Sequence, residues 1–161
     1  IEHLDLFALF GMFPANDLVY QIEFGKAAVK RSGNDLTVLT YLSMVHHTAE
    51  ALDQTGIDAD LIDLRWLDKA SFDWETVGAS IKKTNSVLIV EQGAKGTSYG
   101  TWLADEIQRR FFDYLDQPVQ RVTGGEAAPS ISKVLERAAI AKTEEVVEGL
   151  TRTMANVRGG N

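Results

Sequence analysis

The sequence predicts an α/β domain: a three-layer sandwich in which helices cover both faces of a sheet of about five strands, most of them parallel and one antiparallel. Residues 57–93 read as strand, loop, amphipathic helix and buried strand without a break, which is the pattern of a parallel crossover unit. The 161 residues suit one domain with a sizeable core. Ligands of open α/β sheets gather at the carboxyl ends of strands, so we expect a site at Glu91 and the glycine-rich loop 92–100.

The chain before this unit predicts an irregular apolar segment and two strands. Residues 1–20 are rich in apolar side chains without a period of 2 or 3.6, and Pro14 and Asn16-Asp17 interrupt them. Residues 27–31 and 36–41 read as strands joined through Ser32-Gly33-Asn34, a spacing that favours a hairpin. The hairpin accounts for the antiparallel strand of the predicted sheet.

Three of the predicted helices have clear end signals. Ser43 is placed to cap the first, which Gly56 ends in a left-handed turn. Asp73 caps the helix of the crossover unit, between a strand at 57–64 and an apolar strand at 87–90. Thr143 caps the last helix. The inward faces consist of Met44, Val45, Thr48, Ala49, Ala51 and Leu52 in the first helix, Trp74, Val77 and Ile81 in the second, and Val146, Val147, Leu150, Met154 and Val157 in the last.

Between the last two of these helices the chain predicts one more helix and one more strand. The helix covers residues 99–112, with Leu103, Ile107 and Phe111 at i+4 spacing. The strand covers residues 119–123. The predicted sheet is thereby complete.

Composition excludes several classes of function. A net charge of −7 argues against a nucleic-acid binder, whose affinity comes mostly from basic residues, and favours a basic partner. The absence of cysteine excludes disulfides, thiolate zinc sites and thiol catalysis. No apolar run approaches the ~20 residues of a membrane span, so we expect no membrane association. The loop at 93–100 matches neither G-x-G-x-x-G nor the P-loop pattern, and no metal-binding cluster is apparent.

Three residues are candidates for chemistry at the carboxyl ends of the strands. His46 and His47 fall in the first turn of a helix that follows a strand, where an imidazole can meet a substrate or a phosphate. The competing interpretation, which we favour, is a polar helix start with one histidine facing inward and one outward, bonded to backbone or to an adjoining domain. Glu91 can act as an acid or accept hydrogen bonds from loop amides, and we favour the second role.

Three blocks carry a family resemblance: residues 57–93, GKAAVKRSGNDLTVLTY at 25–41, and FFDYLDQPVQRVTG at 111–124. They resemble the C-terminal, transketolase-like domain of the β subunit of the E1 component of 2-oxo acid dehydrogenase complexes, of the pyruvate, branched-chain 2-oxo acid or acetoin type. The resemblance implies a parent enzyme, cytoplasmic or in the mitochondrial matrix, that decarboxylates a 2-oxo acid on thiamine diphosphate and Mg²⁺ and passes the acyl group to lipoyl-E2. In that family the cofactor lies between the α subunit and the preceding β domain, so we expect no cofactor bound to this chain.

The resemblance also implies a division of the chain and a set of partners. It assigns residues 1–24 to an interdomain connection, 25–157 to the domain and 158–161 to a frayed tail. The implied partners are the E1 α subunit or a fused α region, a second β subunit, and the subunit-binding domain of E2. Asp116, which precedes Pro118, and Glu126 are the residues we expect to contact E2, because carboxylates in this region pair with its arginines.

The sequence departs from the family in two places. Residues 126–130, EAAPS, replace a common Pro-x-Pro-Tyr element, and Thr97, Ser98 and Tyr99 replace a Gly-Gly or Gly-Phe pair. Within the superfamily the alternative is a transketolase or deoxyxylulose phosphate synthase C-terminal domain, and the Leu-Asp-x-Pro turn at 115–118 favours E1β. The alternative from another class is a free-standing flavodoxin-like binding module, against which the absent phosphate fingerprint argues.

Overall fold

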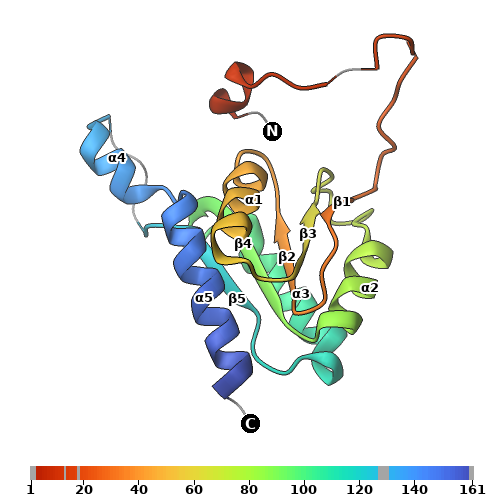
Figure 1. Ribbon diagram of the computed structural model, residues 1–161, viewed down its shortest axis with the longest axis vertical. Helices are drawn as coiled ribbons and strands as arrows, with labels where there is room; N and C mark the ends of the chain where they lie inside the picture. Colours follow the sequence, from red (N-terminus) through yellow and green to blue (C-terminus); the bar gives the residue numbers. More distant parts are fainter. Residues whose placement is uncertain (1–2, 13, 18, 127–130, 160–161) are drawn as a thin grey trace.

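A five-stranded sheet lies between two layers of helices (Figure 1), as the sequence predicts. The computed structural model describes residues 3–12, 14–17, 19–126 and 131–159. The strands are β1 (Ala28–Arg31), β2 (Leu36–Thr40), β3 (Ala59–Asp63), β4 (Val87–Ala94) and β5 (Gln120–Gly124). The helices are α1 (Met44–Thr55), α2 (Trp74–Thr84), α3 (Tyr99–Phe111), α4 (Lys133–Ala139) and α5 (Thr143–Gly159), with short 3-10 helices η1 (Leu4–Ala8) and η2 (Phe112–Tyr114).

The strand order is β1-β3-β2-β4-β5, and only β1 is antiparallel to its neighbour. The predicted hairpin is wrong, because β1 pairs with β3 rather than with β2. Gly33 lies against the start of β3, where a Cβ atom would overlap the backbone of Ala59. The backbone N–H groups of Asn34 and Asp35 both donate to the carbonyl of Asp58. These contacts lead the chain past the amino end of β3 before it enters the sheet as β2.

The helix ends follow the sequence signals in two of four cases. Gly56 ends α1 with φ of 66°, and the Asp73 carboxylate caps α2 by accepting the N–H of Thr76. Ser43 makes no capping hydrogen bond, because its own backbone is already helical and a capping side chain needs an extended one. Thr143 lies inside α5, and its hydroxyl bonds to α1 instead.

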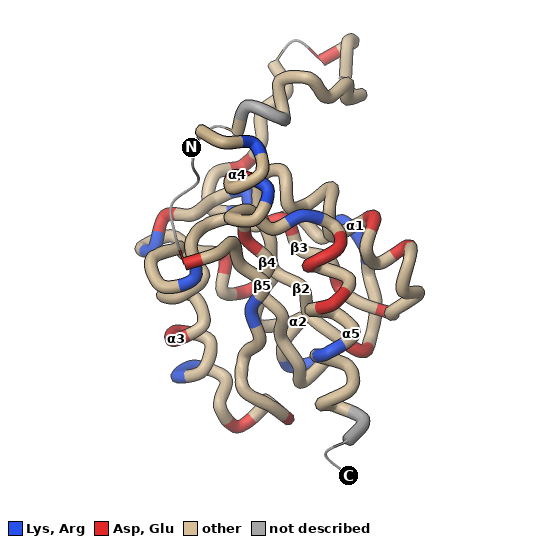
Figure 2. The backbone as a smooth tube through the Cα atoms, turned by 90° about the vertical axis from the view of Figure 1, so that its left-hand side faces the viewer, with Lys and Arg blue, Asp and Glu red and all other residues tan. Residues whose placement is uncertain are grey.

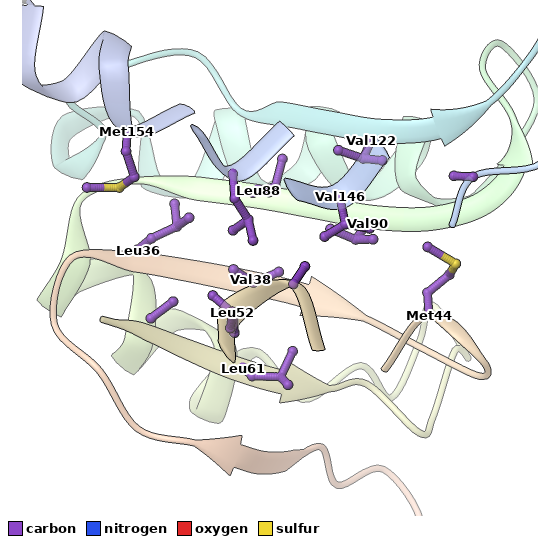
Figure 3. Close-up of a cluster of buried hydrophobic side chains, with 14 residues drawn as sticks. Leu36, Val38, Met44, Leu52, Leu61, Leu88, Val90, Val122, Val146 and Met154 are labelled. Atoms are coloured by element: carbon purple, nitrogen blue, oxygen red, sulfur yellow. The ribbon is translucent and has the colours of Figure 1, made fainter. Parts of the chain in front are cut away.

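Two apolar cores hold the layers together, one on each face of the sheet. Figure 3 shows the first, in which Leu36, Val38, Leu88 and Val90 of the central strands meet side chains of α1 and α5. The second packs β2, β3 and β4 against α2 and α3 and includes Leu39, Ile62, Val77, Ile81, Ile89, Leu103 and Ile107. Because each fully buried aliphatic side chain contributes about 1.5–3 kcal/mol, these two clusters dominate the stability of the fold.

The segment before β1 extends away from the domain and returns over the carboxyl edge of the sheet (Figure 1). We call residues 3–24 the leader. His3 bonds the side chain of Gln92, which brings η1 back to β4. Figure 2 shows the leader arm with acidic residues but without Lys or Arg, whereas Lys and Arg are interspersed with Asp and Glu over the rest of the tube. Its apolar side chains at Phe7, Phe10, Met12 and Phe24 are largely or fully exposed.

Candidate functional site

Glu91 lies near the carboxyl end of β4 and is fully buried. Its carboxylate accepts four hydrogen bonds: from Tyr41 Oη at 3.0 Å, Ser98 Oγ at 2.7 Å, the N–H of Gly100 at 2.8 Å and Arg121 Nη2 at 2.8 Å. The donors come from the residue after β2, the start of α3 and the second residue of β5, so one carboxylate connects three strands and a helix. The favoured interpretation of Glu91 as a hydrogen-bond acceptor is confirmed.

The local sequence explains how this carboxylate is accommodated. A Cβ atom at residue 100 would overlap Glu91 Oε1, so the close approach requires glycine. Gly100 is in the first turn of α3, where free N–H groups and the helix dipole favour a negative charge. In the folded protein, the helix N-terminus and the Arg121 guanidinium therefore replace water as partners of the carboxylate.

The phenols around Glu91 stay protonated. Burial, followed by the charge of Glu91, raises the pKa of Tyr41 well above its ordinary value. Burial, followed by the charge of Asp68, raises the pKa of Tyr99 to about 12. Tyr41 thus remains a donor at neutral pH.

The chemistry open to the cluster follows from its saturation. A carboxylate offers about four lone-pair positions, and four donors occupy those of Glu91. No position remains for a substrate proton. Glu91 thus holds the carboxyl edge of the sheet in one geometry rather than acting as an acid.

Sequence reasoning missed the partners of Glu91 that lie outside the loop, Tyr41 and Arg121. Arg121 lies in β5 with its side chain 20% exposed, and its Nε makes no hydrogen bond among the described residues. An arginine inside a predicted strand next to a buried glutamate is the signal that points to this pair, since a half-buried charge needs a partner. The contact joins residues 30 positions apart, and nothing local in the sequence specifies it.

The structure separates the two histidines. His46 is exposed and lines a cavity at the carboxyl edge of the sheet. His47 is half-buried, and its Nδ1 bonds Thr143 Oγ1 at 2.8 Å, while the same hydroxyl bonds Glu50 of α1. The expected arrangement of one outward and one inward neighbour is confirmed, but the partner of His47 is a side chain of α5 rather than backbone or an adjoining domain. His47 joins α1 to α5, and a catalytic role for either histidine stays a prediction.

Asp116 and Glu126 lie at opposite ends of β5 rather than side by side. The five residues of β5, at about 3.3 Å per residue, put more than about 15 Å between them. Asp116 is exposed, and its backbone N–H donates to Asn85. Glu126 is exposed too and faces Lys95 at 3.7 Å. The two residues therefore belong to different surfaces.

The family model described as transketolase, C-terminal domain matches residues 25–146. The chain belongs to the transketolase C-terminal domain family. Two curated relatives give a finer comparison. A pyruvate dehydrogenase E1 component subunit beta from Mesostigma viride is 35% identical over 159 residues, which cover 97% of this chain and 47% of the relative. A 2-oxoisovalerate dehydrogenase subunit beta from Pseudomonas aeruginosa is 42% identical over 108 residues, 67% of this chain and 30% of the relative.

A solved structure confirms the fold of this transketolase C-terminal domain. A split-gene transketolase, described as an inactive β4 tetramer, superposes with a TM-score of 0.67 at 20% identity and covers 84% of this chain and 44% of its own. At that identity the likeness concerns the fold alone. The chain spans less than half the length of the curated relatives named above.

The described residues do not fit a metal-diphosphate site. They hold no group of three or more His, Asp or Glu side chains that could bind a metal ion. The glutamate cluster is saturated by its own donors. Nor is any helix within the described ranges both long and apolar enough to cross a membrane.

Proposed function

We propose that this chain is the C-terminal domain of the β subunit of a thiamine diphosphate-dependent 2-oxo acid dehydrogenase E1. The observation that carries the proposal is the coverage of 97% of the chain by an E1 β subunit at 35% identity. A second E1 β relative, from Porphyra purpurea, is 34% identical over 92% of the chain. The transketolase alternative rests on likeness of fold at 20% identity, and one fold can serve many functions.

In this proposal the parent enzyme decarboxylates a 2-oxo acid and transfers the acyl group to the lipoyl arm of E2, while the domain serves assembly and docking. The saturated carboxylate at Glu91 supports a structural role, because it offers no group to a substrate. We place the parent in the cytoplasm, or in the mitochondrial matrix of a eukaryote. A 34% identical relative from Dictyostelium discoideum is named mitochondrial.

The exposed leader supports the assembly role. Its side chains at Phe7, Phe10, Met12 and Phe24 are largely or fully exposed, and large exposed apolar surface often marks contacts with other proteins. We assign residues 1–24 to the connection with a preceding domain and expect the domain to pair with a second β subunit. Sedimentation of the 161-residue chain at micromolar concentration should show a dimer. A monomer with the leader packed on its own core would contradict this assignment.

The acidic character of the chain supports the docking role. The net charge is −7, and the exposed Asp113 and Asp116 flank the exposed ring of Tyr114 near the amino end of β5. Neither carboxylate makes an ion pair within the described residues. A basic subunit-binding domain of E2 can therefore pair with them without breaking an internal contact. Glu126 belongs to a different surface and serves as a second candidate.

Substrate turnover of the parent enzyme tests the proposal. The purified parent, supplied with thiamine diphosphate, Mg²⁺ and an artificial electron acceptor, should oxidise pyruvate or a branched-chain 2-oxo acid. The same preparation should transfer no ketol group from a sugar phosphate to an aldose phosphate. Ketol transfer without 2-oxo acid oxidation would assign the chain to the transketolase branch instead.

A further inference from the structure

A cavity of about 740 Å³ opens at the carboxyl ends of β2 and β3. Its floor consists of the residues that directly follow these two strands and of the first turn of α1, where His46 lies. Leader residues at both ends of the arm, Leu6 and 22–24, form the opposite wall. The cavity therefore lies between the domain and the leader, the kind of boundary where small-molecule sites concentrate.

The backbone beneath this cavity is strained. Leu42 and Arg65 have φ of 55° and 52°, and they are two of the three non-glycine residues with positive φ in the described part of the chain. Each follows the end of one of two neighbouring parallel strands, and each lines the cavity. Bulky side chains rarely adopt the left-handed region, and such residues persist mostly where a site requires them.

One wall of the cavity is aromatic. The rings of Phe24 from the leader and Trp66 from the loop after β3 lie 5.0 Å apart at 42°. Further apolar lining comes from Leu42 and Val45. Flat apolar groups bind well to such surfaces, because rings pack by offset or tilted contact and exclude water.

The charged wall holds donors that have no short partner. Lys30 Nζ and Arg65 Nε lie 4.0 and 3.8 Å from the mostly buried Asp63 carboxylate, and these distances are too long for hydrogen bonds. Neither side chain makes a hydrogen bond to another described residue. Two cations thus share one carboxylate at this wall. Of the other charged lining residues, Lys26 bonds Glu75 and Asp68 bonds Ser71, and Glu23 lies on the leader wall.

We propose that this cavity binds a small organic anion that carries a flat apolar or aromatic body. Its phosphate or carboxylate binds Arg65 and Lys30, since the guanidinium fork matches both groups, and its body packs against Trp66 and Phe24. The site goes beyond the proposed E1 function: it lies away from the acidic docking surface, and it borders the glutamate cluster at Tyr41, which lines the cavity. Since the leader supplies one wall, the ligand joins the leader to the domain.

Binding of 1-naphthyl phosphate to the 161-residue chain tests the ligand class. Calorimetry and tryptophan fluorescence should give a dissociation constant below 1 mM, on the order expected for a ligand of this size. 1-Naphthol has the rings without the charge, and inorganic phosphate has the charge without the rings. Each should bind at least about tenfold weaker, a loss of about 1.4 kcal/mol. Comparison with 1-naphthoate shows whether the site prefers phosphate or carboxylate.

Two variants locate the site. Arg65→Asn removes the guanidinium but keeps a residue that tolerates positive φ, and it should weaken binding of 1-naphthyl phosphate at least about tenfold. Arg109→Asn removes an exposed arginine on α3 as the matched control and should bind like the wild type. If circular dichroism shows that Arg65→Asn misfolds, Lys30→Met decides in its place. The proposal is overturned if the wild type binds nothing at millimolar ligand, or if the cavity variant and the Arg109 control bind alike.

Discussion

Replacement of Glu91 by Gln should destabilise the domain more than any single surface substitution. The change removes the negative charge that pairs with Arg121, whose Nη2 lies 2.8 Å from Glu91 Oε1 in the buried cluster. It also places an amide NH₂ group, which is a donor, opposite other donors: the hydroxyls of Ser98 and Tyr41 and the N–H of Gly100. Only one of the two side-chain oxygens remains to accept.

The magnitude follows from the burial of the pair. Removal of one partner from a buried ion pair costs about 3–5 kcal/mol, because the other charge is left uncompensated. Arg121 is 20% exposed, so part of its charge regains water, and the lower end of that range, about 3 kcal/mol, applies. In a chain of this size 1 kcal/mol lowers Tm by roughly 2–4 °C, so the expected fall is roughly 6–12 °C.

A double-mutant cycle measured by chemical denaturation separates the ion pair from the other contacts. Glu91→Gln, Arg121→Met and the double variant should show a coupling energy of about 2 kcal/mol, because the double variant buries no unpaired charge. Asp105→Asn on the exposed face of α3 is the matched control and should leave Tm unchanged. A Glu91→Gln stability within about 0.5 kcal/mol of the wild type, or strictly additive effects, would refute the role assigned to this cluster.

Three further predictions follow from the charges of the domain. In the full enzyme, Asp116→Ala should weaken binding of the E2 subunit-binding domain at low salt, by about 1 kcal/mol if the ion pair between Asp116 and E2 is desolvated. Surface plasmon resonance measures this, and equal binding by variant and wild type would remove Asp116 from the docking surface. Calorimetric titration of the 161-residue chain should show no magnesium-dependent binding of thiamine diphosphate. Micromolar binding that requires Mg²⁺ would contradict the proposal that this domain serves assembly and docking. Burial raises the pKa of Asp60, but hydrogen bonds from Lys83, Ser80 and Gly33 outweigh burial and hold that pKa below its ordinary 3.8. The carboxylate form therefore stabilises the fold above about pH 4, and the free energy of unfolding should fall as the pH drops below this value. Asp60→Asn should make that fall smaller in an acid titration.

Much of the fold could be predicted because its signals are local. The period of apolar residues through 57–93 predicts β3, α2 and β4, and Asp73 and Gly56 mark helix ends within a few residues of the groups they contact. The place of β1 could not be predicted in this way. It depends on Gly33 packing against Ala59, a contact between residues 26 positions apart. The short α4 also escaped prediction, since Val134 and Leu135 are exposed and form no buried face.

The candidate site divides along the same line. Glu91 could be predicted as a hydrogen-bonded carboxylate because a charged residue that ends an apolar strand needs nearby amides, and Gly100 lies nine residues on. Tyr41 and Arg121 could not be predicted, since the strand order that brings them to Glu91 is a property of the whole sheet. The separation of Asp116 from Glu126, by contrast, follows from the strand predicted at 119–123, because an extended segment keeps its two ends apart.

The most direct test of the account is assembly of the parent enzyme with and without this domain. Sedimentation velocity of the α subunit mixed with intact β subunit, in the presence of labelled E2 subunit-binding domain, should show one large species that carries the label. A β subunit that lacks residues 25–157 should fail to pair with a second β subunit and should leave the label unbound. Assembly and E2 binding that persist unchanged after the deletion would contradict the assignment of this domain to assembly and docking.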